Sequence, residues 1–264
     1  MLRIMVCGAY GKMGREVLKA IHKDEDLALV GAMDATSDFA DVGDLIGIAK
    51  IGVVVGNDLQ TVIHETKPQI MVDFTRPEAV MANIRIAIHN GVCPVVGTTG
   101  LSEADIKEVR ELCEDNKMNA LISPNFSIGA ILMMKLAQDA AKFFPNVEII
   151  EMHHDQKLDA PSGTALRTAE LIAQNRGYLQ QGHPAEVEKL AGARGGNLSG
   201  IRIHSIRLPG YVAHQEVIFG GLGETLTIRH DSISRESFMP GVVLACKRVL
   251  KVKGLVHGLE HMLT

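Results

Sequence analysis

The densest group of potentially reactive side chains in this sequence lies between residues 151 and 165, where two adjacent histidines precede a lysine. Histidine is the side chain best suited to proton transfer near neutral pH, and a lysine can supply positive charge or a second proton. Neighbouring side chains on a strand point to opposite faces, so we expect His153 and His154 to have different roles. Lys157 follows His153 by four residues, and this spacing indicates a site that protonates a bound anion.

A Ser-Gly-Thr turn, Ser162 to Thr164, follows the histidines and opens an amphipathic stretch over 163–174. Serine is a preferred N-cap, and the N–H groups at a helix N-terminus attract anions. Together with the hydroxyls of Ser162 and Thr164, this turn is suited to holding a carboxylate. The segment therefore predicts a site for an anionic substrate that is protonated as it reacts.

The histidine segment has two other interpretations. His153 and His154 could bind a metal ion, but the segment lacks a third well-spaced ligand and Lys157 would repel a cation. The segment could also be a structural loop, although so many reactive side chains in one loop favour a functional site. We therefore predict no metal site.

A second motif, Gly8 to Gly14, fits the pattern G-x-x-G-x-x-G. Such a match is weak by itself, because glycines are common at tight turns. Here an apolar run precedes it, a helical pattern follows, and Asp34 lies 20 residues beyond Gly14 at the end of the next apolar run. Glycines let the backbone approach a pyrophosphate, and the acid can accept hydrogen bonds from the adenosine ribose. The motif predicts a nicotinamide dinucleotide site.

The residue after Asp34 bears on the choice of dinucleotide. A carboxylate repels a 2′-phosphate, and Ala35 offers nothing to offset the repulsion. Lys12, within the glycine loop, is a cation that could do so. The sequence therefore favours NADH and leaves NADPH open.

Composition narrows the functional classes. The 264 residues are 46% hydrophobic with a formal net charge of −4, and the basic stripe of a nucleic-acid-binding protein is missing. No apolar run approaches the roughly 20 residues that span a bilayer, and the N-terminus does not read as a signal peptide. The four cysteines are widely spaced. We expect a cytoplasmic protein with reduced thiols and no membrane or nucleic-acid partner.

The order of elements predicts two domains. The first half should alternate strands (2–7, 27–33, 69–74, 93–96, 119–123) with helices (12–23, from 77 to near 91, 103–116), which indicates a doubly wound parallel sheet of Rossmann type. Beyond residue 126 we expect helices over 128–144 and 163–174, strands over 147–152, 200–207, 212–219 and 224–230, and a long loop over 177–197. A helical tail over 237–251 should return to the first domain. We thus expect a dinucleotide-binding domain, 1–126 plus 236–264, and an α+β domain with a mixed sheet, 127–235.

The run His-His-x-x-Lys-x-Asp-Ala-Pro-Ser-Gly-Thr-Ala over 153–165 resembles the signature of the 4-hydroxy-tetrahydrodipicolinate reductase family. The resemblance extends over essentially the whole chain. It includes the glycine loop, the turn Gly97-Thr98-Thr99-Gly100, the segment Ser123-Pro124-Asn125-Phe126-Ser127, and Arg235. Ala35 departs from it, because some members carry an arginine there for the 2′-phosphate.

The resemblance implies an NADH- or NADPH-dependent reduction of a cyclic unsaturated dicarboxylate in diaminopimelate and lysine biosynthesis, by a homotetramer assembled through the second domain. His153 and Lys157 resemble the catalytic residues. The residues that resemble substrate contacts are His154, Lys157, Ser162, Gly163, Thr164, Thr99 and Arg235. Those that resemble cofactor contacts are Gly8, Ala9, Tyr10, Gly11, Lys12, Met13, Asp34, Gly97, Thr98, Thr99, Ser123, Pro124, Asn125 and Phe126.

Three rival functions are a reductase of another small dicarboxylate, a non-catalytic dinucleotide sensor, and a metal-dependent hydrolase that uses the histidines. The first should not need the long run over 153–165. The sensor leaves His153 and Lys157 without a role, and activity after chelation would exclude the hydrolase.

Overall fold

The computed structural model describes residues 1–177 and 179–263; Tyr178, in the loop expected over 177–197, and Thr264, at the expected end of the first domain, lie outside the described residues. The chain divides into two units, Met1–Ile128 with Phe238–Thr264, and Gly129–Ser237. Residues 127 and 128 thus join the first unit and 236 and 237 the second, a shift of two residues at each expected boundary.

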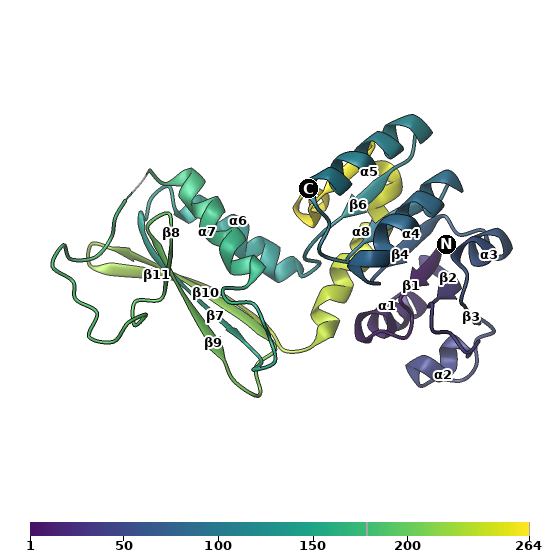
Figure 1. Ribbon diagram of the computed structural model, residues 1–264, viewed down its shortest axis with the longest axis horizontal. Helices are drawn as coiled ribbons and strands as arrows, with labels where there is room; N and C mark the ends of the chain where they lie inside the picture. The colour runs from purple at the N-terminus through teal and green to yellow at the C-terminus, as the bar shows by residue number, and fades with distance from the viewer. Residues whose placement is uncertain (178, 264) are drawn as a thin grey trace. The chain divides into compact units, whose positions relative to one another are not determined.

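The first unit is built on one seven-stranded sheet in which every pairing is parallel (Figure 1). Its strand order is β12-β6-β5-β4-β1-β2-β3. The strands are β1 (Leu2–Cys7), β2 (Leu27–Met33), β3 (Val55–Gly56), β4 (Ile70–Asp73), β5 (Cys93–Val96), β6 (Ala120–Ile122) and β12 (Leu255–His257). The strands β2 and β3 extend the sheet on one side of β1. The strands β4, β5, β6 and β12 then extend it on the other side, as in a doubly wound fold.

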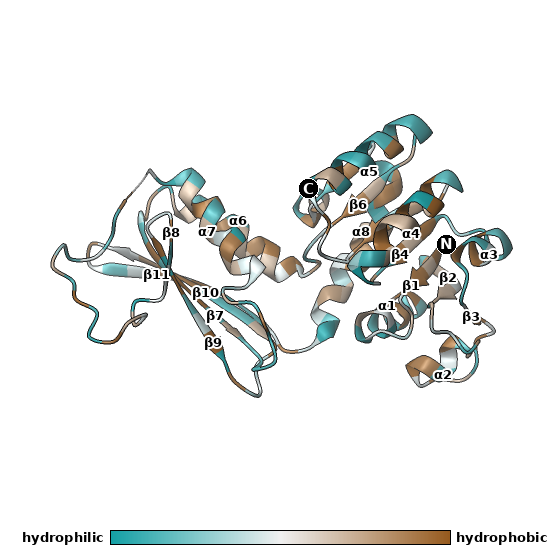
Figure 2. Cartoon of the chain, viewed as in Figure 1, coloured by the Kyte–Doolittle hydropathy of each residue, from teal (hydrophilic) through white to brown (hydrophobic). Residues whose placement is uncertain are grey.

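The helices of the first unit pack on this sheet, because each has an apolar stripe that the sheet buries. They are α1 (Lys12–Lys23), α2 (Val42–Ile46), α3 (Leu59–Thr66), α4 (Pro77–His89), α5 (Glu103–Asn116) and α8 (Met239–Arg248). One core cluster joins α3 to β1 and β4, and a second joins α4 and α5 to β5 and β6. Figure 2 shows the strands of this sheet largely in brown, the hydrophobic end of the scale. Such near-continuous apolar strands are typical of a parallel sheet covered on both faces.

The C-terminal segment completes the first unit. Lys247 of α8 pairs with Asp24 at 2.9 Å and with Asp26 at 2.7 Å, both in the turn between α1 and β2. Cys246, on the same helix, is fully buried. Unit 1 is therefore formed by two separate stretches of chain.

The second unit has a five-stranded mixed sheet, in the order β11-β10-β7-β9-β8. Its elements are α6 (Ile128–Ala140), β7 (Asn146–His153), α7 (Gly163–Asn175), β8 (Gly196–Leu198), β9 (Ile201–Arg207), β10 (Ala213–Gly221) and β11 (Glu224–Ser232). Both helices pack on one face, where residues such as Ile149, Ala169 and Phe219 form a common core (Figure 1). Strand side chains alternate between this helix-covered face and the opposite face, here called the open face.

Several expected elements differ from the structure. The helix expected over 128–144 ends at Ala140, where the hydrogen bonds tighten from i→i−4 to i→i−3 ahead of Pro145. The loop expected over 177–197 gives up its last two residues to β8. Four elements of the first unit, α2, β3, α3 and β12, were not predicted. Three of them have five residues or fewer, too few for a periodic pattern.

Candidate functional site

The glycine loop in the first unit is held by contacts that exclude larger side chains. Gly8 has a φ of +82°, and a Cβ there would lie 2.5 Å from the Phe74 carbonyl oxygen. A Cβ on Gly14 would lie 1.9 Å from the Gly8 carbonyl oxygen. The loop therefore packs tightly against the start of α1, whose N-cap, Gly11, has no side chain to occupy the first N–H groups. These groups can hold a pyrophosphate, and Lys12 beside them is exposed.

Asp34 lies directly after β2 and contacts the glycine loop. One carboxylate oxygen accepts the Tyr10 N–H at 3.0 Å, and the other accepts the N–H and hydroxyl of Thr36 at 3.0 and 2.8 Å. Burial raises the pKa of Asp34, but these hydrogen bonds and the nearby charge of Arg76 outweigh it and lower the pKa. The predicted acid is thus ionised next to the predicted loop. Tyr10 also donates its hydroxyl to Asp38, a contact that the sequence did not indicate.

The turn over 97–100 is fixed by a buried carboxylate. Asp73, at the end of β4, is fully buried and accepts hydrogen bonds from Thr98 Oγ1 and Asn83 Nδ2, each at 2.8 Å, and from the Thr75 N–H and hydroxyl. Sequence reasoning missed Asp73, although an acid at the end of an apolar strand is a recognisable signal. Gly97 is required as well, because its Cβ would lie 2.2 Å from the Phe74 ring.

A cavity of about 330 Å³ adjoins this turn. Thr98 and Thr99 line it together with Pro124, which follows β6, and His257. The structure therefore brings two of the predicted cofactor segments to one cavity at the carboxyl ends of β5 and β6, where open α/β sheets bind ligands.

The rest of the segment over 123–126 is built into the first unit. Ser123 Oγ donates to the Asn125 carbonyl at 2.6 Å and accepts the Leu259 N–H at 3.2 Å. Phe126 is buried, with its ring centroid 5.7 Å from that of Phe74. The hydroxyl of Ser123 thus forms hydrogen bonds within the first unit, and the ring of Phe126 packs in its interior.

In the second unit, His153 is the last residue of β7 and is held by a buried acid. Its Nδ1 lies 2.5 Å from Glu151 Oε2, and the Glu151 side chain has no exposed surface. Arg207, at the end of β9, contacts both oxygens of Glu151, at 2.9 and 2.7 Å. Burial raises the pKa of Glu151, but the hydrogen bonds from His153 and Arg207 outweigh it and lower the pKa to about 2. Glu151 is therefore a buried, ionised carboxylate.

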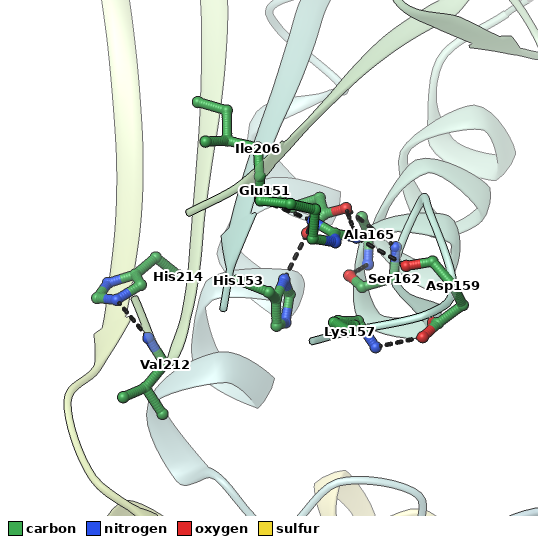
Figure 3. A network of polar contacts seen from close by, with 10 residues as sticks. Glu151, His153, Lys157, Asp159, Ser162, Ala165, Ile206, Val212 and His214 are labelled. Atoms are coloured by element: carbon green, nitrogen blue, oxygen red, sulfur yellow. Dashed lines mark hydrogen bonds and ion pairs between the residues drawn. The ribbon is translucent and has the colours of Figure 1, made fainter. Parts of the chain in front are cut away.

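Lys157 belongs to the same network. Its ammonium lies 2.7 Å from Asp159 Oδ1, and this contact lowers the pKa of Asp159. Figure 3 draws the pair as a dashed line beside His153. The Arg207 guanidinium donates to the Asp159 carbonyl oxygen at 2.7 Å. The network therefore links His153, which is 15% exposed, to Lys157, which is 22% exposed, through the buried Glu151, the half-buried Arg207 and the exposed Asp159. Solvent reaches both reactive side chains.

The predicted helix start is present. Ser162 caps α7 by accepting the Ala165 N–H at 3.2 Å, and its own N–H donates to Glu151 at 3.3 Å. Its hydroxyl is therefore engaged in the cap. At Gly163 nothing lies within 4 Å of where a Cβ would be, so the backbone there is open. Thr164 is half-buried in the first turn of the helix.

His154 and Arg235 stand apart from this network. His154 follows β7 and accepts the Lys157 N–H through its backbone carbonyl, at 3.2 Å. Arg235 begins an exposed 3-10 turn, Arg235–Phe238, and no hydrogen bond among the described residues joins it to His153 or Lys157. The structure thus brings His153, Lys157 and Ser162 together, and leaves Arg235 outside the group.

Glu151 and Arg207 are the residues of this site that sequence reasoning missed. Glu151 carried a signal, because it is an acid that lies two residues before His153, on the same face of the strand. Arg207 carried none, since only the pairing of β7 with β9 places it opposite His153.

Two further features concern the described part of the chain. No group of three histidine, cysteine, aspartate or glutamate side chains within it is arranged to hold a metal ion. No helix within it is long and apolar enough to cross a membrane.

Comparison with known proteins gives consistent matches over both units. Residues 2–126 match the family model described as dihydrodipicolinate reductase, N-terminus, and residues 129–263 match its C-terminus. A curated protein of Desulfitobacterium hafniense named 4-hydroxy-tetrahydrodipicolinate reductase is 57% identical over 263 residues, covering 99% of this chain and 98% of its own. One of the same name from Syntrophomonas wolfei is 54% identical, again over 99% and 98% of the two chains.

Solved structures agree. The dipicolinate-bound dihydrodipicolinate reductase of Paenisporosarcina sp. TG-14 has a TM-score of 0.90 and 46% identity, with both chains covered completely. An amine dehydrogenase of Mycobacterium smegmatis, at 16% identity and a TM-score of 0.69, shares only the fold, over 98% of this chain and 95% of its own. The match of both family models, together with relatives that are more than half identical along their whole length, shows that this chain belongs to the dihydrodipicolinate reductase family.

Proposed function

We propose that this protein reduces 4-hydroxy-tetrahydrodipicolinate, through its dehydrated form, to tetrahydrodipicolinate with NADH or NADPH, in diaminopimelate and lysine biosynthesis. The observation that carries this proposal is the network that joins His153 and Lys157 through Glu151, Arg207 and Asp159. It stands in a chain more than half identical to curated 4-hydroxy-tetrahydrodipicolinate reductases. A related solved structure is named as binding dipicolinate, a cyclic dicarboxylate.

The first unit binds the dinucleotide in this proposal. The glycine loop suits a pyrophosphate, because Gly11 at the N-cap of α1 leaves the first N–H groups of the helix without a side-chain partner. Asp34 would accept hydrogen bonds from the ribose, and the cavity beside Thr98, Thr99 and Pro124 would receive the nicotinamide end. When bound, the cofactor supplies a hydride. Gly97, Asn125 and Phe126 would support this end of the site.

The second unit binds and protonates the substrate in this proposal. Hydride addition to one atom of a C=N or C=C unit leaves negative charge on its partner atom, and an acid at that point lowers the barrier by about 10²–10⁴-fold. His153 would transfer this proton. Lys157 and the N–H groups at Gly163 and Thr164 would hold the substrate carboxylates, with His154 at the edge of the site. Thr99 and Arg235 are proposed as further substrate contacts.

The test is NADH oxidation at 340 nm, coupled to a synthase that makes the substrate from pyruvate and aspartate semialdehyde, and repeated with NADPH. We expect oxidation that depends on the synthase and survives chelation of metal ions. A protein that binds NADH but oxidises neither cofactor would be a reductase of another dicarboxylate or a dinucleotide sensor.

Cofactor preference can be tested at Asp34. Asp34 also accepts a hydrogen bond from the Tyr10 N–H. The variant for this test is therefore Asp34→Asn, which removes the charge and keeps an acceptor oxygen. We expect the kcat/KM ratio to move toward NADPH by about fivefold to tenfold, since a like charge near the 2′-phosphate is removed. Asp26→Asn is the matched control. It removes the same charge directly before β2, whereas Asp34 lies directly after it. An unchanged ratio in Asp34→Asn would mean that Asp34 does not face the ribose.

We further propose that the protein is a cytoplasmic homotetramer assembled through the open face of the second sheet. All four cysteines are free and buried, which suits a reducing compartment. The helices α6 and α7 cover only one face of the sheet, and Ile150, Ile206 and Ile218 lie partly exposed on the other. We expect Ile218→Arg to lower the mass measured by light scattering. An unchanged mass would place the interface elsewhere.

A further inference from the structure

Glu151 has no exposed surface, and its contacts come from its own strand, from β9 (Arg207 and the Ser205 side chain) and from the start of α7. Nδ1 of His153, on the same strand, lies 2.5 Å away. The guanidinium of Arg207, from β9, makes one contact to each oxygen, and the N–H of Ser162, from the start of α7, lies 3.3 Å from Oε1. The carboxylate is therefore fixed from three directions, and His153 is the one of these partners with a titratable ring.

This contact determines which nitrogen of His153 can act on a ligand. An ionised carboxylate only accepts hydrogen bonds, so Nδ1 must carry the proton that it donates to Glu151. The neutral ring then has Nε2 as its basic atom, and the protonated ring gives up its proton at Nε2. A carboxylate–histidine pair of this kind fixes both the tautomer and the orientation of the ring.

Arg207 extends the same control to Lys157. One nitrogen of its guanidinium donates both to Glu151 Oε1 and to the Asp159 carbonyl oxygen, each at 2.7 Å, and the Asp159 carboxylate holds the Lys157 ammonium. A single side chain from β9 thus links the supports of both reactive groups. Across the sheet, β10 places the uncharged Ala213 opposite His153. The charged groups facing His153 are therefore Glu151, Arg207, Lys157 and Asp159.

We propose that Glu151 and Arg207 are positioning residues: Glu151 holds His153 as the Nδ1–H tautomer so that Nε2 transfers the proton, and Arg207 holds Glu151 and the Lys157 loop in register. The kinetic part of this inference rests on the proposed reductase function. The tautomer part does not, because it concerns the free protein.

The tautomer is tested first, in the unaltered protein. Solid-state ¹⁵N NMR of protein labelled at the imidazole nitrogens distinguishes Nδ1–H from Nε2–H, and the His153→Gln variant identifies which signals belong to His153. We expect Nδ1–H for the neutral ring. An Nε2–H ring would overturn the inference whether or not the protein reduces the proposed substrate, whereas Nδ1–H in a protein without reductase activity would leave it standing and refute only the proposed function.

The second test is a double-mutant cycle on kcat. We expect Glu151→Gln to lower kcat about 100-fold, within the range of general acid catalysis, with a much smaller change in KM. Because the loss of the carboxylate charge destabilises the imidazolium, the falling limb of the pH–rate profile should move to lower pH. If Glu151 acts through His153, adding Glu151→Gln to His153→Gln should cost nothing further; two losses that multiply would overturn the inference.

Glu148→Gln is the matched control for that cycle. It removes the same charge from the same strand, from a carboxylate that also contacts one histidine and one arginine, but on the open face. We expect its pH–rate profile to keep the position of its falling limb. Arg207→Lys keeps a cation beside Glu151 but loses the two-pronged contact, so it should lower kcat without moving the limb. A shift as large in Glu148→Gln as in Glu151→Gln would refute a specific role for Glu151.

Discussion

The two faces of the second sheet carry the same three residue types in two different settings. On the helix-covered face, Glu151 contacts His153 and Arg207. On the open face, Glu148 contacts His204 at 2.8 Å and Arg194 at 2.5 Å. The two glutamates are three residues apart on β7, so the alternation of the strand sends them to opposite faces. Composition alone does not distinguish these two clusters.

Burial and choice of nitrogen do distinguish them. The Glu151 side chain has no exposed surface, whereas that of Glu148 is 31% exposed. His153 contacts its glutamate through Nδ1, but His204 uses Nε2, the nitrogen farther from the backbone. Arg194 comes from the long loop and pairs also with Glu186, so its cluster holds that loop to the sheet. The same three residue types thus leave Nε2 of His153 unbound by its glutamate behind a buried acid, and Nδ1 of His204 unbound by its glutamate beside a partly exposed one.

The largest expected difference between the clusters is in catalysis. We expect His153→Gln to lower kcat by about 10²–10⁴-fold, because it removes the group proposed to transfer the proton, while the Kd for NADH stays within a factor of about two. His204→Gln should change kcat by less than about threefold. Stopped-flow turnover and fluorescence titration of NADH measure the two quantities. Equal losses in turnover and NADH binding for His153→Gln would contradict its assignment to proton transfer.

The next difference is in stability. Glu151→Gln leaves Arg207 half-buried without its counter-charge, and we expect a loss of about 3–5 kcal/mol in the free energy of unfolding. Glu148→Gln should cost about 0–1 kcal/mol, because the Glu148 carboxylate is only partly buried, at 31% exposed. Urea unfolding followed by circular dichroism measures both. Similar losses in the two variants would mean that burial does not separate the clusters.

The smallest difference is in the response to acid. The pKa of Glu151 in the folded protein, about 2, is below its ordinary value of 4.5, so the ionised carboxylate stabilises the fold fully above about pH 4.5. This stabilisation, about 3 kcal/mol, is lost as the pH falls toward 2. The stability gap between the unaltered protein and Glu151→Gln should therefore be constant above pH 5 and narrow below 4.5. A gap that stays constant down to pH 3 would show that Glu151 titrates normally.

Much of the fold could be predicted because its signals are local. The helices predicted over 12–23, from 77 to near 91 and over 103–116, and the cap at Ser162, are all confirmed by the structure. The two-residue strand β3 and the edge strand β12 could not be predicted, because pairing with a neighbour, rather than their own sequence, makes them strands.

The residues of the candidate site could be predicted together only where they lie close in sequence. His153, Lys157 and Ser162 lie within ten residues, so one segment of sequence contains them all. Arg207 lies 56 residues from Glu151, and its contact depends on the parallel register that pairs His153 with Arg207. Sequence separation, and not the kind of residue, explains why it was missed.

That register has a consequence for how the protein folds. A slip of one residue between β7 and β9 would turn the Arg207 side chain to the other face and leave the buried Glu151 carboxylate without its guanidinium partner. The pairing closes a loop of some 50 residues that includes α7, and such long-range contacts form slowly. The ion pair therefore opposes misalignment: a chain that pairs these strands in the wrong register buries an unmatched charge, and only the correct register brings Arg207 to Glu151.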